Sequence, residues 1–223
     1  IPSQPAPPTV KTVEPEQNGD RRAEIEFESH PYIAISYHIP AVGHPDLYAL
    51  DVLSSLLSDG RTSRLYKSMI EDKRIAVMAH AYDEISKYPD TFTFLAAPRA
   101  PHTVAEVESA IYEEIEKLKN APPSDWELQK IKNQLEADFI RDLNSASGLA
   151  NEIGHFEVLS DWRYINTFLD KVAQVTAEDV MGVAMKYFTK NNRTVAILVK
   201  KENNTKMKET KDNNRPEKST VTY

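Results

Sequence analysis

Residues 22–39 read RAEIEFESHPYIAISYHI, a pattern that predicts two consecutive strands. Over residues 22–28 apolar and charged side chains alternate, so that Ala23, Ile25 and Phe27 share one face of an extended chain. Over residues 32–39 the alternation returns, now with apolar residues on both faces, and this is again typical of a strand. The chain therefore opens its folded part with a pair of strands.

A helix is expected directly after these strands. His44-Pro45-Asp46 places a proline where a helix can begin, and an apolar stripe runs from there to Asp59-Gly60. The stripe consists of Leu47, Leu50, Leu53, Leu56 and Leu57. This spacing predicts a helix that faces the core and stops at a glycine. A second, short helix is expected over residues 63–72.

The remaining elements follow in order. Residues 76–82 and 91–97 predict two strands joined by a turn around residues 87–90. Capping boxes at Thr103, with Glu106, and at Ser124, with Glu127, open two helices, and the second runs through Leu143. Further helices are expected over 162–172 and from Thr176 to about Phe188, and residues 194–199 predict a last buried strand.

This order of elements predicts the α+β class. Strand pairs precede a block of helices and one strand returns at the end, which indicates an antiparallel or mixed sheet of about five strands with helices packed on one face. Residues 1–20 are proline-rich and are interpreted as an interdomain linker. Residues 21–200 form the folded domain, and the polar segment 201–223 is expected to be a disordered tail.

The composition argues against several classes of function. The formal net charge of −7 disfavours nucleic acid as a partner, and no apolar run is long enough to predict a membrane span. The chain contains no cysteine, which excludes thiolate metal sites and leaves the compartment open. We expect the cytoplasm or periplasm of a bacterium, with the periplasm favoured.

Motifs that carry catalysis are absent from the sequence. There is no glycine-rich phosphate loop and no Gly-x-Ser-x-Gly turn, and none of the six histidines begins His-Glu-x-x-His or His-x-x-Glu-His. We therefore predict no catalytic residue and no metal ligand in this chain. His80 with Asp83 and Glu84 is interpreted as a polar cluster at a strand end, and His155 as a surface or capping residue.

The spacing of charged residues on the long helix is explained by exposure of one helix face to solvent. Asp138, Arg141 and Asp142 recur at three- and four-residue spacing, which is typical of a solvated helix face. No acid–base role is assigned to them.

Several runs resemble the pitrilysin/insulinase family of zinc metallopeptidases, which includes the mitochondrial processing peptidases. The strongest is LLSDGRTSRL at 56–65, which leads into IEDKRIA at 70–76. The others are KNQL at 132–135, VTAEDV at 175–180 and TVAILV at 194–199. The resemblance covers roughly residues 21–200, in order and with compatible spacing.

The resemblance implies a two-part protein. Members of this family have two similar halves that close around a peptide, and one half carries His-x-x-Glu-His and zinc. This chain resembles the other half, so zinc is expected in a missing N-terminal half and no cofactor in this chain. In many active members the second half supplies an Arg and, seven residues later, a Tyr. The aligned positions here are Ile70 and Val77, neither of which donates a side-chain hydrogen bond.

Two hypotheses of function follow from the resemblance. The first is the zinc-free half of a two-domain peptidase, which encloses and helps bind a peptide but is inactive alone. The alternative is a non-catalytic structural or assembly subunit of the same family. Expected partners are the N-terminal zinc-binding half, a peptide substrate and a homo- or heterodimer partner. Arg74, Tyr66 and Tyr82 are close enough in sequence to replace the missing Arg and Tyr, and the pattern favours none of them.

Overall fold

A computed structural model describes residues 14–201, and its centre is one mixed five-stranded sheet. The strands are β1 (Arg21–Phe27), β2 (Tyr32–Ile39), β3 (Ala76–Asp83), β4 (Asp90–Pro98) and β5 (Arg193–Lys200). Their order across the sheet is β1-β5-β2-β4-β3, with β1 parallel to β5 and the other neighbours antiparallel. The predicted α+β class and mixed sheet are confirmed. The predicted tail, apart from its first residue, and the first 13 residues of the predicted linker lie outside the described residues.

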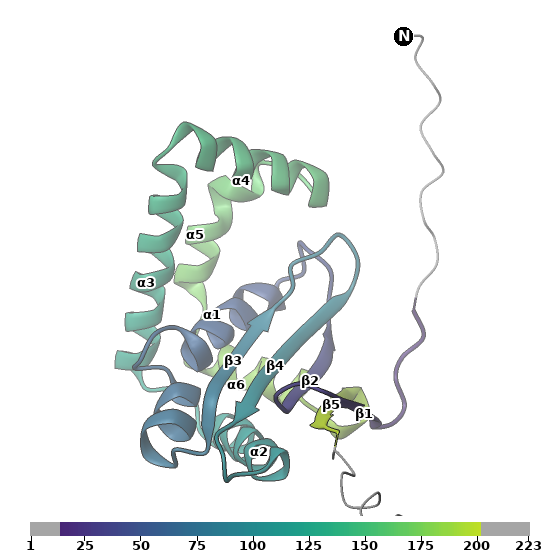
Figure 1. Cartoon of the computed structure of the whole chain (residues 1–223). Helices are drawn as coiled ribbons and strands as arrows, with labels where there is room; N and C mark the ends of the chain where they lie inside the picture. Colours follow the sequence, from purple (N-terminus) through teal and green to yellow (C-terminus); the bar gives the residue numbers. More distant parts are fainter. Residues whose placement is uncertain (1–13, 202–223) are drawn as a thin grey trace, which may run out of the picture.

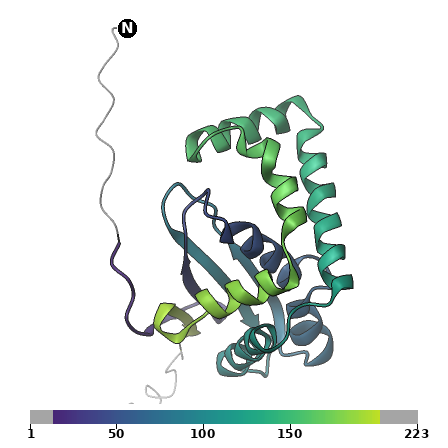
Figure 2. The ribbon, with the colours of Figure 1, turned by 180° about the vertical axis from the view of Figure 1, so that it is seen from behind.

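The helices lie on one face of this sheet or rise above it (Figure 1). They are α1 (Asp46–Ser58), α2 (Val104–Asn120), α3 (Asp125–Leu143), α4 (Ala146–Leu159), α5 (Tyr164–Gln174) and α6 (Ala177–Tyr187), with a π-helix η1 (Tyr66–Asp72) and a 3-10 turn η2 (Lys190–Asn192). Figure 2, seen from behind, shows α1, α2 and α6 in front of the strands. Helices α3, α4 and α5 form an arm that projects beyond the sheet.

Burial along the strands identifies the face that packs on the helices. In β2 the side chains of Ile33, Ile35, Tyr37 and Ile39 are buried, and the alternate ones are partly exposed. Phe92 and Phe94 of β4 and Val195 and Ile197 of β5 point to the same buried side. Against them α1 contributes the leucine stripe predicted from the sequence, which is buried throughout. The core therefore lies between the sheet and α1, α2 and α6.

Local signals position the helix ends as predicted. Thr103, Ser124 and Thr176 each accept a hydrogen bond from the backbone N–H three residues later, and the acidic side chain at that later position bonds back. These reciprocal bonds satisfy N–H groups that a helix end leaves free. Gly60, at φ +71°, turns the chain after α1.

Two features differ from the sequence prediction. Residues 146–159 form α4, although the sequence predicted no element there. Helix α4 has Phe156 as its buried residue and includes two glycines, so its apolar periodicity is weak. The predicted short helix over 63–72 is present mainly as the π-helix η1, which is followed by Arg74 at φ 55°. That left-handed conformation ends the helix and turns the chain into β3.

Candidate functional site

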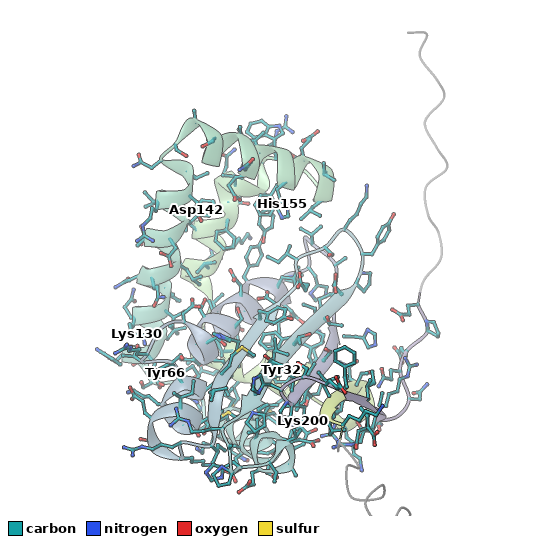
Figure 3. All side chains as sticks on the ribbon, viewed as in Figure 1. Tyr32, Tyr66, Lys130, Asp142, His155 and Lys200 are labelled. Atoms are coloured by element: carbon teal, nitrogen blue, oxygen red, sulfur yellow. The ribbon has the colours of Figure 1, made fainter. Side chains whose placement is uncertain are left out.

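The second face of the sheet is the candidate site, because among residues 14–201 no helix covers it (Figure 1). We call it the uncovered face. Strand register identifies its members. They are Arg21, Ala23, Ile25 and Phe27 of β1, Thr194, Ala196, Leu198 and Lys200 of β5, Tyr32, Ala34, Ser36 and His38 of β2, Thr91, Thr93 and Leu95 of β4, and His80 and Tyr82 of β3. Val77 of β3 has no register partner and lies exposed at the edge of this face. Figure 3 shows Tyr32 on this side of the sheet.

Side-chain size varies across the uncovered face. On the central strands Ala34 lies between Ala196 and Leu95, and Ser36 lies between Thr194 and Thr93. The Ser36 and Thr93 hydroxyls are 2.8 Å apart and hydrogen-bonded. The large exposed side chains lie on the two edge strands, β1 and β3. The centre is therefore a floor of small apolar and hydroxyl side chains with bulkier residues along its edges.

Edge strand β1 turns its apolar side away from the core. Ile25 and Phe27 are 58% and 61% exposed, and they lie on the uncovered face. Its alternate residues point to the helical side, where Arg22 forms paired hydrogen bonds with Glu108 of α2, at 2.7 and 2.8 Å. An amphipathic strand normally buries its apolar side, so this orientation exposes a hydrophobic patch at the sheet edge.

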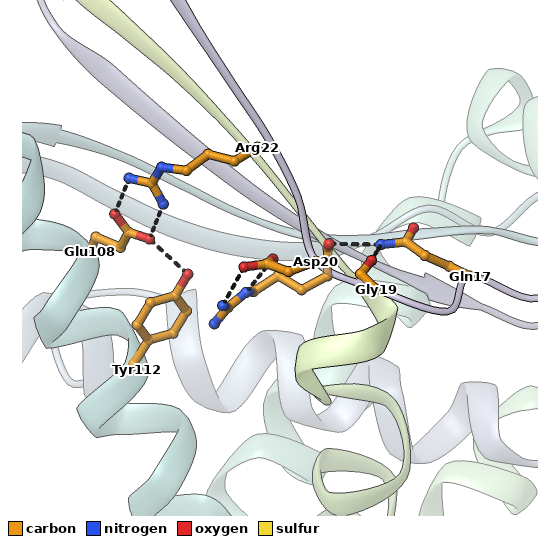
Figure 4. Close-up of polar contacts among 7 residues, drawn as sticks. Gln17, Gly19, Asp20, Arg22, Glu108 and Tyr112 are labelled. Atoms are coloured by element: carbon orange, nitrogen blue, oxygen red, sulfur yellow. Dashed lines mark hydrogen bonds and ion pairs between the residues drawn. The ribbon is translucent and has the colours of Figure 1, made fainter.

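A polar network fixes β1 in this orientation (Figure 4). The Arg22 guanidinium lowers the pKa of Glu108, and Tyr112 donates a hydrogen bond to the same carboxylate at 2.8 Å. Arg193 pairs with Asp20 at 2.8 and 2.9 Å and lowers the pKa of that carboxyl group. The Arg193 guanidinium also lies 4.5 Å from the centre of the Tyr112 ring. The start of β1 is thus tied to both β5 and α2.

Gln17 anchors the segment that enters β1. Its amide nitrogen donates to the carbonyl oxygens of Gly19 and Arg193, both at 2.7 Å. Its amide oxygen lies 3.2 Å from Nε2 of His38 and accepts from Thr194 at 3.4 Å. The entering chain therefore reaches the sheet at the His38 end of the uncovered face.

Ile70 and Val77 have different environments. Ile70 lies in η1 and packs, half-buried, against the core. Val77 is the extra residue of a β-bulge in β3, and it is 58% exposed at the edge of the uncovered face. Neither side chain offers a polar group.

The three residues suggested as replacements for the missing Arg and Tyr also have different environments. Tyr82, 40% exposed, lies on the uncovered face beside Thr93. Tyr66 is half-buried in η1, and the Arg74 side chain bonds back to the Glu71 carbonyl oxygen. Tyr82 is thus the one of the three that the strand register places on the uncovered face.

The polar residues that the sequence analysis interpreted as structural lie in different parts of the molecule. His80 is exposed on the uncovered face, whereas Asp83 points to the helical side. His155 is exposed on α4, and Arg141 pairs with Asp138 on the surface of α3 at 2.5 Å. Figure 3 shows Asp142 and His155 on the arm, away from the strands.

Comparison with known proteins identifies the family. The family model described as "Peptidase M16 inactive domain" matches residues 1–135. The chain belongs to this family. The relationship confirms the pitrilysin-like resemblance seen in the sequence. The curated zinc protease PqqE of Helicobacter pylori is 31% identical over 194 residues, which are 86% of this chain and 44% of that protein.

Solved structures share the M16 inactive-domain fold. A protease from Helicobacter pylori superposes with a TM-score of 0.84 at 30% identity, over 88% of this chain and 48% of that one. The inactive peptidase domain of a zinc protease from Bordetella parapertussis superposes with a TM-score of 0.70 at 22% identity, over 82% and 98% of the two chains. The present chain thus spans less than half the length of PqqE and about the length of an isolated inactive domain.

The family implies zinc, and the described residues do not fit a zinc site. Within residues 14–201 no group of three or more His, Asp or Glu side chains is placed to hold a metal ion. No hydrolytic step is therefore assigned to these residues. A search of the same residues for a helix long and apolar enough to cross a membrane found none.

Sequence reasoning missed the exposure of the uncovered face. The alternation in β1 indicated which residues share a face, and it carries no information on which side of the sheet the helices cover. The charge of Arg22 was the one indication in the sequence. Its ion pair with Glu108 holds the charged side of β1 against α2 and so turns the apolar side away from the helices.

Proposed function

We propose that this chain is the zinc-free half of a two-domain zinc peptidase, and that its uncovered face encloses a peptide against the zinc-binding half. One observation carries the proposal. A sheet face with Ile25 and Phe27 more than half exposed lies beside an entry segment anchored by Gln17. Burial of such side chains is worth about 1.5–3 kcal/mol each, so a partner surface over this face is strongly favoured.

The floor of the uncovered face suits an extended peptide. Ala34 and Ala196 leave room for a second backbone, and the hydroxyls around Ser36 and Thr93 offer donors and acceptors. The charged members of the face, Arg21 and Lys200, lie at opposite ends of the β1–β5 pair, so the middle of the face fits recognition of a peptide by its backbone and apolar side chains.

The division of labour follows from the residues present. The zinc-binding half would hold the metal, which would activate a water for peptide hydrolysis at neutral pH. The residues of this chain exclude water, hold the peptide extended and position it. Ile70 and Val77 offer no hydrogen bond to a developing oxyanion, so such stabilisation has to come from other groups.

The proposal is tested by separating the two halves. The chain and the zinc-binding half of its parent polypeptide are purified apart and assayed for zinc and for cleavage of unstructured peptides, alone and mixed. We expect no turnover by the chain alone, no stoichiometric zinc in it, and turnover by the mixture.

Two other outcomes contradict the proposal in different ways. If the zinc-binding half alone matches the rate of the mixture, this chain does not help enclose the substrate. If the halves form a zinc-loaded complex that cleaves nothing, the structural or assembly-subunit alternative replaces the peptidase.

A further inference from the structure

The junction between the helical arm and the body of the protein is aromatic. Tyr48 of α1 stacks on Tyr164 of α5, with ring centres 5.8 Å apart and planes 11° apart. Tyr164 in turn stacks on Phe156 of α4 at 4.5 Å, and Phe168 of α5 lies 6.3 Å from Tyr48. We call this set the arm junction. It is the contact through which α4 and α5 reach α1.

Two carboxyl groups, those of Asp51 and Asp83, lie close enough to the arm junction for their charges to act on the Tyr164 hydroxyl. Asp51 is on α1, one turn after Tyr48, and Asp83 ends β3. The Oδ2 atom of Asp83 is buried and has no hydrogen-bond partner among the described residues. Within residues 14–201 neither carboxyl group forms an ion pair with Lys, Arg or His. Both residues are half-buried, and two half-buried carboxylates without a cation are costly, so a proton is the simplest compensation.

The surroundings from each packed element are neutral or acidic. Helix α1 contributes Ser54 near Asp83. Asp59, directly after α1, adds a negative charge that raises the pKa of Asp51. Helix α5 contributes the Tyr164 hydroxyl, whose pKa is raised by burial, by Tyr48 and by the two carboxylates. On the strands, Glu84 follows Asp83, and the cross-strand partner of Asp83 on β4 is Phe92.

The pKa values of both carboxyl groups are raised. Burial raises the pKa of Asp83 to about 6, and burial together with the Asp83 charge raises the pKa of Asp51 well above its usual range. A carboxyl group with a raised pKa in the packed state contributes stability below its ordinary pKa, and this is lost as pH rises through the raised value. The relevant window therefore runs from about pH 4 to above pH 6.

We propose that Asp51 and Asp83 form a proton-operated latch: with a proton on the pair the arm stays packed on α1, and with both carboxylates charged the arm junction loosens. Charge repulsion and entry of water at Asp83 would act on the Tyr48–Tyr164 stack. The latch does not depend on the role of the uncovered face, since the arm lies beyond the sheet.

Hydrogen exchange of the backbone amides of residues 164–174 tests the latch in the 223-residue chain. After correction for the intrinsic pH dependence of exchange, we expect α5 to open about tenfold more readily at pH 8 than at pH 5, because Asp83 titrates between these values. Asp83→Asn mimics the protonated group and is expected to abolish this difference. Asp51→Asn is expected to reduce it.

Asp170→Asn is the matched control, because Asp170 is exposed on α5. It should keep the wild-type dependence on pH. The latch is refuted if Asp83→Asn shows the wild-type dependence. It is refuted equally if Asp83→Asn opens the arm at pH 8, because the charged carboxylate would then be the stabilising form.

Discussion

Phe188→Ala is expected to lower the free energy of unfolding by about 3–5 kcal/mol, the usual cost of truncating a buried Phe. Phe188 is 2% exposed and follows the last residue of α6. Its ring centre lies 4.9 Å from those of Tyr37 and Phe92 and 5.3 Å from that of Phe94. Removal of this ring leaves a cavity where three rings from two strands meet α6.

Chemical denaturation at constant pH measures this effect. Met185→Ala is the matched control, since Met185 lies on α6 three residues before Phe188 and is 55% exposed, and we expect a change within about 0.5 kcal/mol. Phe188→Leu should fall between the two. A loss below about 1 kcal/mol for Phe188→Ala would contradict the placement of the core between the sheet and α6.

Ile25→Glu combined with Phe27→Glu is expected to weaken association with the zinc-binding half by about 100-fold or more. The proposed contact buries both apolar side chains, and loss of about 1.5 kcal/mol at each position accounts for this factor before any cost of burying charge. Binding is measured by titration calorimetry with the separately purified zinc-binding half.

The folded chain should tolerate these two substitutions. Both side chains are more than half exposed, so the free energy of unfolding of the chain alone should change by less than about 1 kcal/mol. Glu24→Gln with Glu26→Gln, on the other side of the same strand, is the matched control and should bind normally. Normal binding of the Ile25→Glu and Phe27→Glu variant would remove β1 from the interface.

The elements with strong local signals could be predicted from the sequence. The leucine stripe of α1 and the capping boxes at Thr103, Ser124 and Thr176 each fix a helix through contacts within a few residues. The five strands alternate or form short apolar runs. Helix α4 could not be predicted, because it packs mainly on neighbouring helices and contains Gly148 and Gly154.

The candidate site could be predicted only in part. Residues of the uncovered face were recognisable as strand residues, but the side on which helices pack depends on contacts such as Arg22 with Glu108, 86 positions apart. The carboxyl pair was missed for the same reason. Asp51 is part of a helix that looks ordinary in sequence, and Asp83 was interpreted as part of a polar cluster at a strand end, because its packing against α1 depends on contacts far apart in the sequence.

Thiol labelling shows whether the zinc-binding half covers the uncovered face, because the chain has no cysteine of its own. Ile25→Cys places one thiol on the uncovered face, and Trp126→Cys places one on α3, where Trp126 is 70% exposed. With a bulky maleimide, we predict that the zinc-binding half slows labelling at position 25 by about tenfold or more and leaves position 126 unchanged. Equal labelling of position 25 in the free chain and in the complex would show that the zinc-binding half does not cover the uncovered face.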